Sequence, residues 1–97
     1  MERIWKLVAE ILVEPRRHAM TKGFMNVTTW AESADSSRDK LAKYIERFNW
    51  HVISIEDARP VADDEECEDE QMEDMIDRTR TNPNAIILGT FHGYKEI

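Results

Sequence analysis

The chain has 97 residues, of which 13 are basic and 20 are acidic, so its formal charge at neutral pH is −7. This length predicts a single domain, residues 1–97, with one modest core. The negative charge excludes a general nucleic-acid binder and a protein held on an anionic membrane, because both need clustered Lys and Arg.

Cysteine content and hydropathy indicate the cellular compartment in which we expect the protein. The single cysteine, Cys67, cannot form an internal disulfide, so the sequence does not indicate an oxidising compartment. Apolar runs are shorter than the roughly 20 residues of a membrane helix, and Lys6 and Glu10 interrupt the segment where a signal peptide would lie. We therefore expect a cytoplasmic protein of bacterial type.

The first predicted elements are extended. The apolar residues of the segment 4–14 alternate like one face of a strand, and they also fit the apolar stripe of a helix. The β-branched content of the segment favours the strand. Pro15 ends the segment in either case. Residues 15–23 are polar and end in glycine, which is typical of a loop, and the β-branched and aromatic residues 24–31 predict a strand.

The clearest helix of the sequence covers residues 33–48. Ser33 or Asp35 can cap its start, because a side-chain oxygen there accepts a hydrogen bond from a free backbone N–H. Asn49 follows the last apolar residue and tolerates the left-handed conformation that often ends a helix. The sequence therefore predicts both ends of this helix.

A strand over residues 50–58, ending near Pro60, and a second helix over residues 63–81 come next. Asp63 with Glu66 resembles a capping box at the start of this helix. Its predicted buried stripe follows the spacing i, i+3, i+4, i+7 and consists of Met72, Met75, Ile76 and Thr79.

Residues 85–94 predict the last strand, in which Gly89 and Gly93 mark bulges or close approaches. The complete order is β-β-α-β-α-β. This order predicts an α+β fold, a two-layer sandwich with both helices on one face of a four-stranded sheet. The order of the strands within the sheet is left open.

A resemblance to a known group of domains rests on four short motifs: GFMNV (23–27), WAES (30–33), FNWHV (48–52) and IEDARPV (55–61). This pattern resembles a group of small bacterial α+β domains of unknown function, whose helix ends in a Gly-Trp pair where this chain has Asn-Trp. The resemblance covers about residues 5–94. It implies a ferredoxin-like fold, favours the strand over residues 4–14, and implies no activity and no catalytic residue.

The most unusual feature is an acidic run between Glu56 and Asp77, in which 12 acidic residues and one basic residue give −11, while the rest of the chain sums to +4. A solvated helix accounts for the run, because early carboxylates favour the positive end of the helix dipole. The functional interpretation is a docking surface for a basic protein, or for the basic part of a second copy. Divalent-cation binding is a third interpretation, although the spacing and glycine of an EF-hand loop are missing. The candidate docking residues are Asp64, Glu65, Glu68 and Asp69.

The sequence predicts no catalytic residue, no metal site and no cofactor. His18, His51 and His92 have no chelating spacing with one another or with Cys67. Cys67 is surrounded by carboxylates, which disfavour a reactive thiolate. The basic loop residues Arg16, Arg17, His18 and Lys22 lack the glycine-rich cradle of a phosphate site.

The predicted strands also indicate that the second face of the sheet is covered. A solvated antiparallel face shows clean alternation of polar and apolar residues, whereas these strands are apolar at many positions of both faces. Large exposed apolar patches mark interfaces, so we expect a second copy to cover this face in a two-fold dimer. The candidate interface residues are Ile4, Val8, Phe24 and Trp30.

Two functions follow from these features. The first is a non-enzymatic interaction module that self-associates through its sheet face and docks a basic protein through the acidic helix, with no nucleic-acid or membrane partner. The alternative is a dimeric ligand-binding protein or small enzyme with a pocket between two paired sheets. Candidate polar groups for that pocket are Asn26, His51, His92 and Tyr94.

Overall fold

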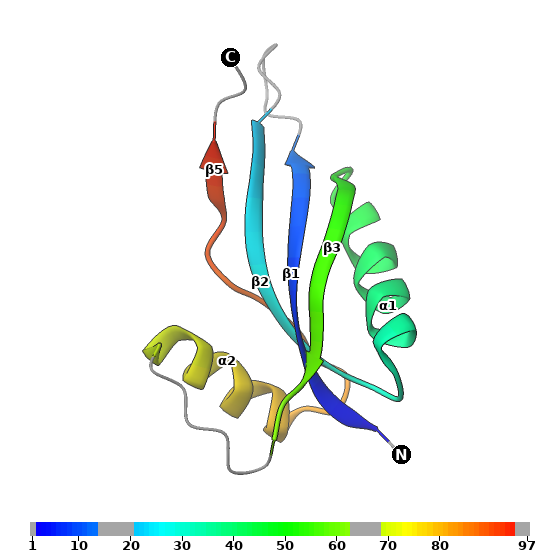
Figure 1. Ribbon diagram of the computed structural model, residues 1–97, viewed down its shortest axis with the longest axis vertical. Coiled ribbons are helices and arrows are strands. Elements are labelled where there is room, and N and C mark those ends of the chain that lie inside the picture. The colour runs from blue at the N-terminus through cyan, green and yellow to red at the C-terminus, as the bar shows by residue number, and fades with distance from the viewer. Residues whose placement is uncertain (1, 14–20, 63–68, 95–97) are drawn as a thin grey trace.

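The computed structural model describes residues 2–13, 21–62 and 69–94 (Figure 1). They form an α+β fold with two helices and an antiparallel sheet of five strands. The elements in chain order are β1 (Arg3–Val13), β2 (Thr21–Ala31), α1 (Ala34–Glu46), β3 (His51–Pro60), α2 (Glu70–Thr81), β4 (Ile86–Leu88) and β5 (His92–Tyr94).

The strand predicted over residues 4–14 is confirmed as β1, which lies in the middle of the sheet. The strand order is β3-β1-β2-β4, and β5 pairs with the other end of β2. β1 and β2 are paired along all 11 residues of each strand, from Arg3 opposite Ala31 to Val13 opposite Thr21. This long central pair provides the frame on which both helices pack.

The strand predicted over residues 85–94 is divided into β4 and β5, so the sheet has five strands rather than four. Gly89 lies at the division, and its N–H donates a hydrogen bond of 2.8 Å to the carbonyl of Asn26. A Cβ at Gly89 would lie 3.1 Å from both that carbonyl and the sulfur of Met75. The predicted close approach at this glycine is therefore confirmed.

One face of the sheet, called the α1 face below, carries the larger core. Directly opposite residues of paired strands point to the same side, so Leu7 and Val27 share this face with their alternate neighbours. They pack against Leu41 and Ile45 of α1, both fully buried. The complete buried cluster is Leu7, Ala9, Ile11, Met25, Val27, Leu41 and Ile45.

The other face, called the α2 face, carries a second and smaller cluster. Ile4 is opposite Trp30 in the β1–β2 pair, and both point away from α1. Ile4 packs with Val61 and with Ile76 of α2. The helices therefore lie on opposite faces, and the expectation of both helices on one face is wrong. The physical reason is that Ile4 and Trp30 give the second face apolar groups at the end where α2 packs, and Thr28 gives it a hydrogen-bonding group.

The strand order also differs from the expected arrangement. The sheet lies between α1 and α2 instead of forming one layer of a two-layer sandwich. With the order β3-β1-β2-β4, a ferredoxin-like arrangement is not confirmed. Figure 1 shows α2, in yellow and orange, across the end of the sheet that carries the N-terminus, while the far ends of β1, β2 and β5 extend beyond it.

The ends of the helices follow from local side-chain chemistry. The Ser33 side-chain oxygen accepts a hydrogen bond of 3.1 Å from the N–H of Ser36 and caps α1, as predicted. Asn49 has a φ of 60°, so the predicted left-handed stop is confirmed. Asp69 caps α2 by accepting from the N–H of Gln71 at 2.9 Å. The capping box predicted from Asp63 and Glu66 lies outside the described residues.

The predicted stripe of α2 is confirmed. Met75, Ile76 and Thr79 are buried, and Met72 is half-buried. Within the described residues, neither helix is long and apolar enough to cross a membrane.

Candidate functional site

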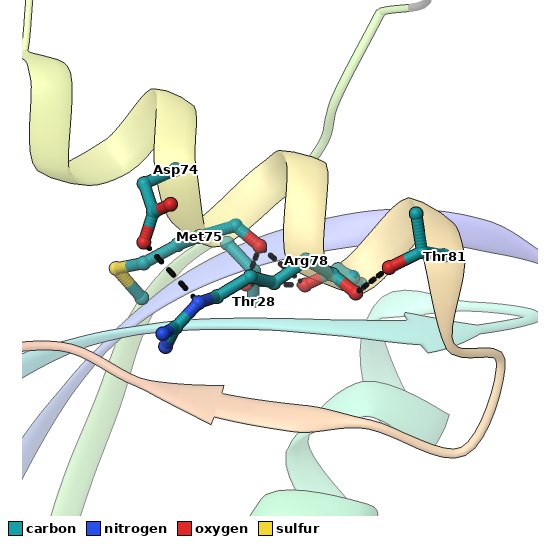
Figure 2. A network of polar contacts seen from close by, with 6 residues as sticks. Thr28, Asp74, Met75, Arg78 and Thr81 are labelled. Atoms are coloured by element: carbon teal, nitrogen blue, oxygen red, sulfur yellow. Dashed lines mark hydrogen bonds and ion pairs between the residues drawn. The ribbon is translucent and has the colours of Figure 1, made fainter.

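A small polar network attaches α2 to β2 (Figure 2). The hydroxyl oxygens of Thr28 and Thr79 lie 2.7 Å apart, and both side chains are fully buried. Thr79 donates to the carbonyl of Met75 at 2.7 Å, and that oxygen lies 3.3 Å from the Thr28 hydroxyl. Each hydroxyl has one proton, so both short contacts of 2.7 Å are satisfied when Thr79 donates to Met75 and Thr28 donates to Thr79.

This network is structurally complete. The indole N–H of Trp30 donates to the carbonyl of Thr79, which adds a second contact between β2 and α2. Among the described residues, every buried side-chain nitrogen and oxygen has a hydrogen-bond partner. The network therefore holds α2 in place and directs no unsatisfied polar atom toward a ligand.

Two of the predicted interface residues lie under α2. Ile4 is 6% exposed within the cluster that contains Ile76, and Trp30 packs against the same cluster. Both point to the α2 face, as the sequence alternation predicted, but α2 of the same chain covers them. Ile4 is therefore a core residue of the monomer, whereas Trp30 is half-buried at the edge of the same cluster.

The other two predicted interface residues, Val8 and Phe24, lie on the same face beyond α2. Phe24 is 37% exposed, and Val8 is half-buried. In the described part of the chain, no helix covers this region of the α2 face. We call it the exposed sheet patch. Its residues, assigned from strand pairing, are Val8, Glu10, Leu12, Lys22, Phe24, Asn26, His51, Ser54, Glu56 and His92.

The polar groups predicted for a pocket do not come together within one chain. His51 is opposite Leu12 at the β3 edge, whereas His92 is opposite Phe24 at the β5 edge. Two strands separate these edges, so the backbones are about 14 Å apart. Tyr94 pairs with Lys22 on β5. Nowhere in residues 2–13, 21–62 and 69–94 do three or more metal-ligating side chains form a group that could hold a metal ion.

The acidic docking surface is described in part. Asp64, Glu65 and Glu68 lie outside the described residues, and Asp69 is the exposed cap of α2. The acidic surface continues along the helix through exposed carboxylates that the candidate set did not include. They are Glu70, Glu73, Asp74 and Asp77, of which Asp74 forms an ion pair of 3.3 Å with Arg78.

A cavity of about 200 Å³ lies between the exposed sheet patch and the start of α2. Asp57 stands at its rim with a φ of 52°, where β3 bulges between the pairs Lys6–Arg59 and Val8–Glu56. No pattern in the sequence predicts this cavity, because a bulge depends on the pairing of two distant strands. Its lining residues are Lys6, Leu7, Val8, Asn26, Asp57, Arg59 and Met72.

A larger groove, of about 610 Å³, separates α1 from β4. α1 and its C-cap residue contribute three cations and a tyrosine, and the chain around β4 contributes two asparagines and an apolar strand. The complete lining is Lys40, Lys43, Tyr44, Arg47, Asn82, Asn84, Ala85, Ile86 and Ile87. Spacing along the sequence does not predict this groove, since its two walls come from segments about 40 residues apart.

Comparisons with protein-family models, with curated proteins and with solved structures found no match for this chain. The resemblance to small bacterial α+β domains therefore stays a prediction.

Proposed function

We propose that the protein is a non-enzymatic interaction module that forms a two-fold dimer through the exposed sheet patch. The observation that supports this function is the incomplete cover of the α2 face. α2 packs on one end of the sheet and leaves Phe24 37% exposed. Exposed apolar residues gathered on one face are typical of interaction sites.

A second copy fits this patch because the patch is complementary to itself. Its apolar side chains, Val8, Leu12 and Phe24, alternate with side chains of both charge signs. A two-fold axis brings each patch against an identical one, so an acidic group on one copy can meet a basic group on the other. Glu10 and Lys22 supply one charge of each sign.

The patch has the size of a reversible contact. Four strands at about 4.8 Å and five residues at about 3.3 Å give a projected area of about 300 Å². A stable interface buries about 800 Å² on each partner, so the exposed sheet patch supports a weaker dimer that dissociates on dilution.

The acidic surface of α2 is the second part of this proposal. Its carboxylates point away from the sheet, because the buried stripe of the helix faces Ile4 and Thr28. The start of α2 borders the exposed sheet patch, whereas Asp74 and Asp77 lie further along the helix, so a dimer would keep these carboxylates available to a basic protein. Such a contact depends on charge and is weakened by salt.

Ligand binding is the alternative function, and the cavity beside Met72 favours it, because this cavity borders the exposed sheet patch. A second copy packed on the patch would also form its roof. A crystal structure of the dimer separates the two functions. An enclosed cavity with polar groups from both copies would support ligand binding, whereas a filled, dry contact would exclude it.

Light scattering coupled to size exclusion, at low and high micromolar concentration, tests the dimer. We expect a dimer that forms as concentration rises and persists at high salt, and we expect Phe24→Ser to remove it. Phe48→Ser is the matched control, because Phe48 is 45% exposed at the end of α1, outside the patch. A wild-type protein that stays monomeric at high micromolar concentration would refute the proposal.

A further inference from the structure

The strand β4 ends the sheet on one side, and its outer backbone groups are directed away from β2. Gly89 donates to the carbonyl of Asn26, so these two residues occupy a hydrogen-bonded position of the β2–β4 pair. Hydrogen-bonded and non-bonded positions alternate in antiparallel pairs. Ile87 therefore directs its N–H and C=O toward β2, whereas Ile86 and Leu88 direct theirs outward.

These outward groups can pair with another strand. The sheet order ends at β4, and within the described residues no backbone hydrogen bond satisfies the outer side of Ile86 or Leu88. An exposed edge of this kind is a template for an added strand. With three residues, β4 offers an edge of about 10 Å.

The groove next to this edge is cationic, although the chain as a whole is strongly acidic. Lys40 and Lys43 of α1 and Arg47, the C-cap of α1, line it, and no acidic residue lines it. Lys40 donates to the carbonyl of Trp30 at 2.9 Å, and Lys43 forms an exposed ion pair of 3.0 Å with Asp39. Arg47 is exposed and has no ion pair within the described part of the chain.

We propose that β4 and the groove beside it bind an acidic, extended peptide segment of another protein, which adds to the sheet as a strand. Ile86 and Leu88 supply the backbone hydrogen bonds that hold the peptide. Side chains of an added strand alternate between the two faces of the sheet. Acidic residues at every second position therefore meet Lys43 and Arg47 on the α1 face, and the positions between them lie next to Ile87.

The occupant is a different protein because the described acidic residues of this chain do not form an extended segment with acidic residues at every second position. Glu56 and Asp57 of the edge strand β3 are adjacent and lack this spacing. The exposed carboxylates from Glu70 to Asp77 belong to the helix α2, which cannot add to β4 as a strand. α2 also packs on the opposite face of the sheet from α1. The site is separate from the exposed sheet patch, so it is independent of the proposed dimer.

The adjacent surface restricts where the acidic side chains of the peptide lie. Toward the start of α1, a neighbouring hollow is lined by Glu2, Glu32 and Asp39 together with Lys40 and Lys43. Favourable charge is therefore confined to the part of the groove between Arg47 and β4. A peptide with negative charges beyond this part would meet carboxylates.

Fluorescence anisotropy with a short labelled peptide of alternating Glu and Val tests the proposal. The protein is used as the full chain, and the Phe24→Ser variant is measured in parallel so that self-association does not affect the result. We expect saturable binding by both proteins, and binding about tenfold weaker for the same peptide with Gln in place of Glu. Equal binding of the Glu and Gln peptides would overturn the charge recognition.

Backbone methylation of the peptide distinguishes strand addition from simple charge attraction. Methyl groups on the nitrogens that face β4 remove the hydrogen bonds, whereas methyl groups on the alternate nitrogens do not. We expect only one of the two methylated peptides to bind. NMR should show the Ile86 and Leu88 amides shifting on binding. Equal binding by both peptides, or shifts confined to other strands, would overturn the proposal.

Charge reversal in the protein gives an independent test of the groove. We expect the double variant Lys43→Glu, Arg47→Glu to weaken binding of the Glu–Val peptide at least about tenfold. Arg59→Glu is the control, because Arg59 is exposed on β3, at the other side of the sheet. Loss of binding in the control, with the protein still folded by circular dichroism, would show a general charge effect and refute the site.

Discussion

The two helices pack on opposite faces of one sheet, and they do so by different means. α1 uses aliphatic side chains, since Leu41 and Ile45 are fully buried among seven core residues. α2 combines Ile76 with the buried hydroxyl of Thr79, which contacts Thr28 of β2. The α1 contact is therefore mainly hydrophobic, whereas the α2 contact also depends on directed hydrogen bonds.

This difference explains why the two faces have different functions in our proposals. Hydrogen bonds to Thr28 and Trp30 hold α2 at one end of the sheet, together with the packing of Ile76. A helix held there leaves Val8 and Phe24 accessible on the same face. The polar network thus contributes to the extent of the exposed sheet patch.

Truncation in the larger core should have the greatest effect. Leu41→Ala removes a fully buried side chain of α1 and leaves a cavity, so we expect a loss of about 2–5 kcal/mol in unfolding free energy. Met72→Ala in the half-buried stripe of α2 should cost less. Urea unfolding monitored by circular dichroism measures both. An equal loss in the two variants would contradict the difference between the helices.

In the polar network, replacing one partner should cost more, relative to replacing both, than independent losses would predict. Thr79→Val leaves Thr28 without its close hydroxyl partner, and we expect a loss of about 1–3 kcal/mol in unfolding free energy. Thr28→Val should cost a similar amount. The double variant should lose clearly less than the sum of the two, because two apolar groups of the same shape leave less polar surface unpaired. A double-mutant cycle in urea measures this coupling, and additive losses would contradict it.

The sequence predicted the local structure better than the arrangement of the elements. The cap at Ser33, the left-handed Asn49 and the buried stripe of α2 depend on residues within a few positions of each other, and all three are confirmed. The face on which α2 packs depends instead on Thr28, 51 residues before Thr79. Spacing within the helix carries no information about that partner.

The candidate sites show the same limit. Alternation in β1 and β2 placed Ile4, Val8, Phe24 and Trp30 on one face, and their strand pairing agrees. Alternation carries no information about which of these four residues α2 covers. The helix packs against Ile4 and Trp30 and leaves Val8 and Phe24 accessible. The α1–β4 groove was not found because Lys43 and Ile86 become neighbours only through the order of the strands.

Gly89 tests the position of α2 from the side of the sheet. In Gly89→Ala the added methyl group would lie 3.1 Å from the Met75 sulfur and from the Asn26 carbonyl, so one of them has to move. We expect a loss of about 1–2 kcal/mol in unfolding free energy. The control is Met75→Ala in the same background, which removes the sulfur and should relieve part of the cost of the methyl group. If Gly89→Ala costs the same unfolding free energy in the wild type and in the Met75→Ala background, the cost comes from the Asn26 carbonyl alone.

The smallest effects should come from the helix caps, where the two helices again differ in chemistry. Ser33 caps α1 with a neutral hydroxyl, and Asp69 caps α2 with a carboxylate. We expect Ser33→Ala and Asp69→Ala each to lose about 1 kcal/mol in unfolding free energy at low salt. Only the Asp69 loss should change with salt, because its charge interacts both with the helix dipole and with the neighbouring carboxylate of Glu70. Thermal unfolding at low and high salt measures the difference, and an identical salt response in the two variants would mean that the charge of the Asp69 cap contributes nothing to the stability of α2.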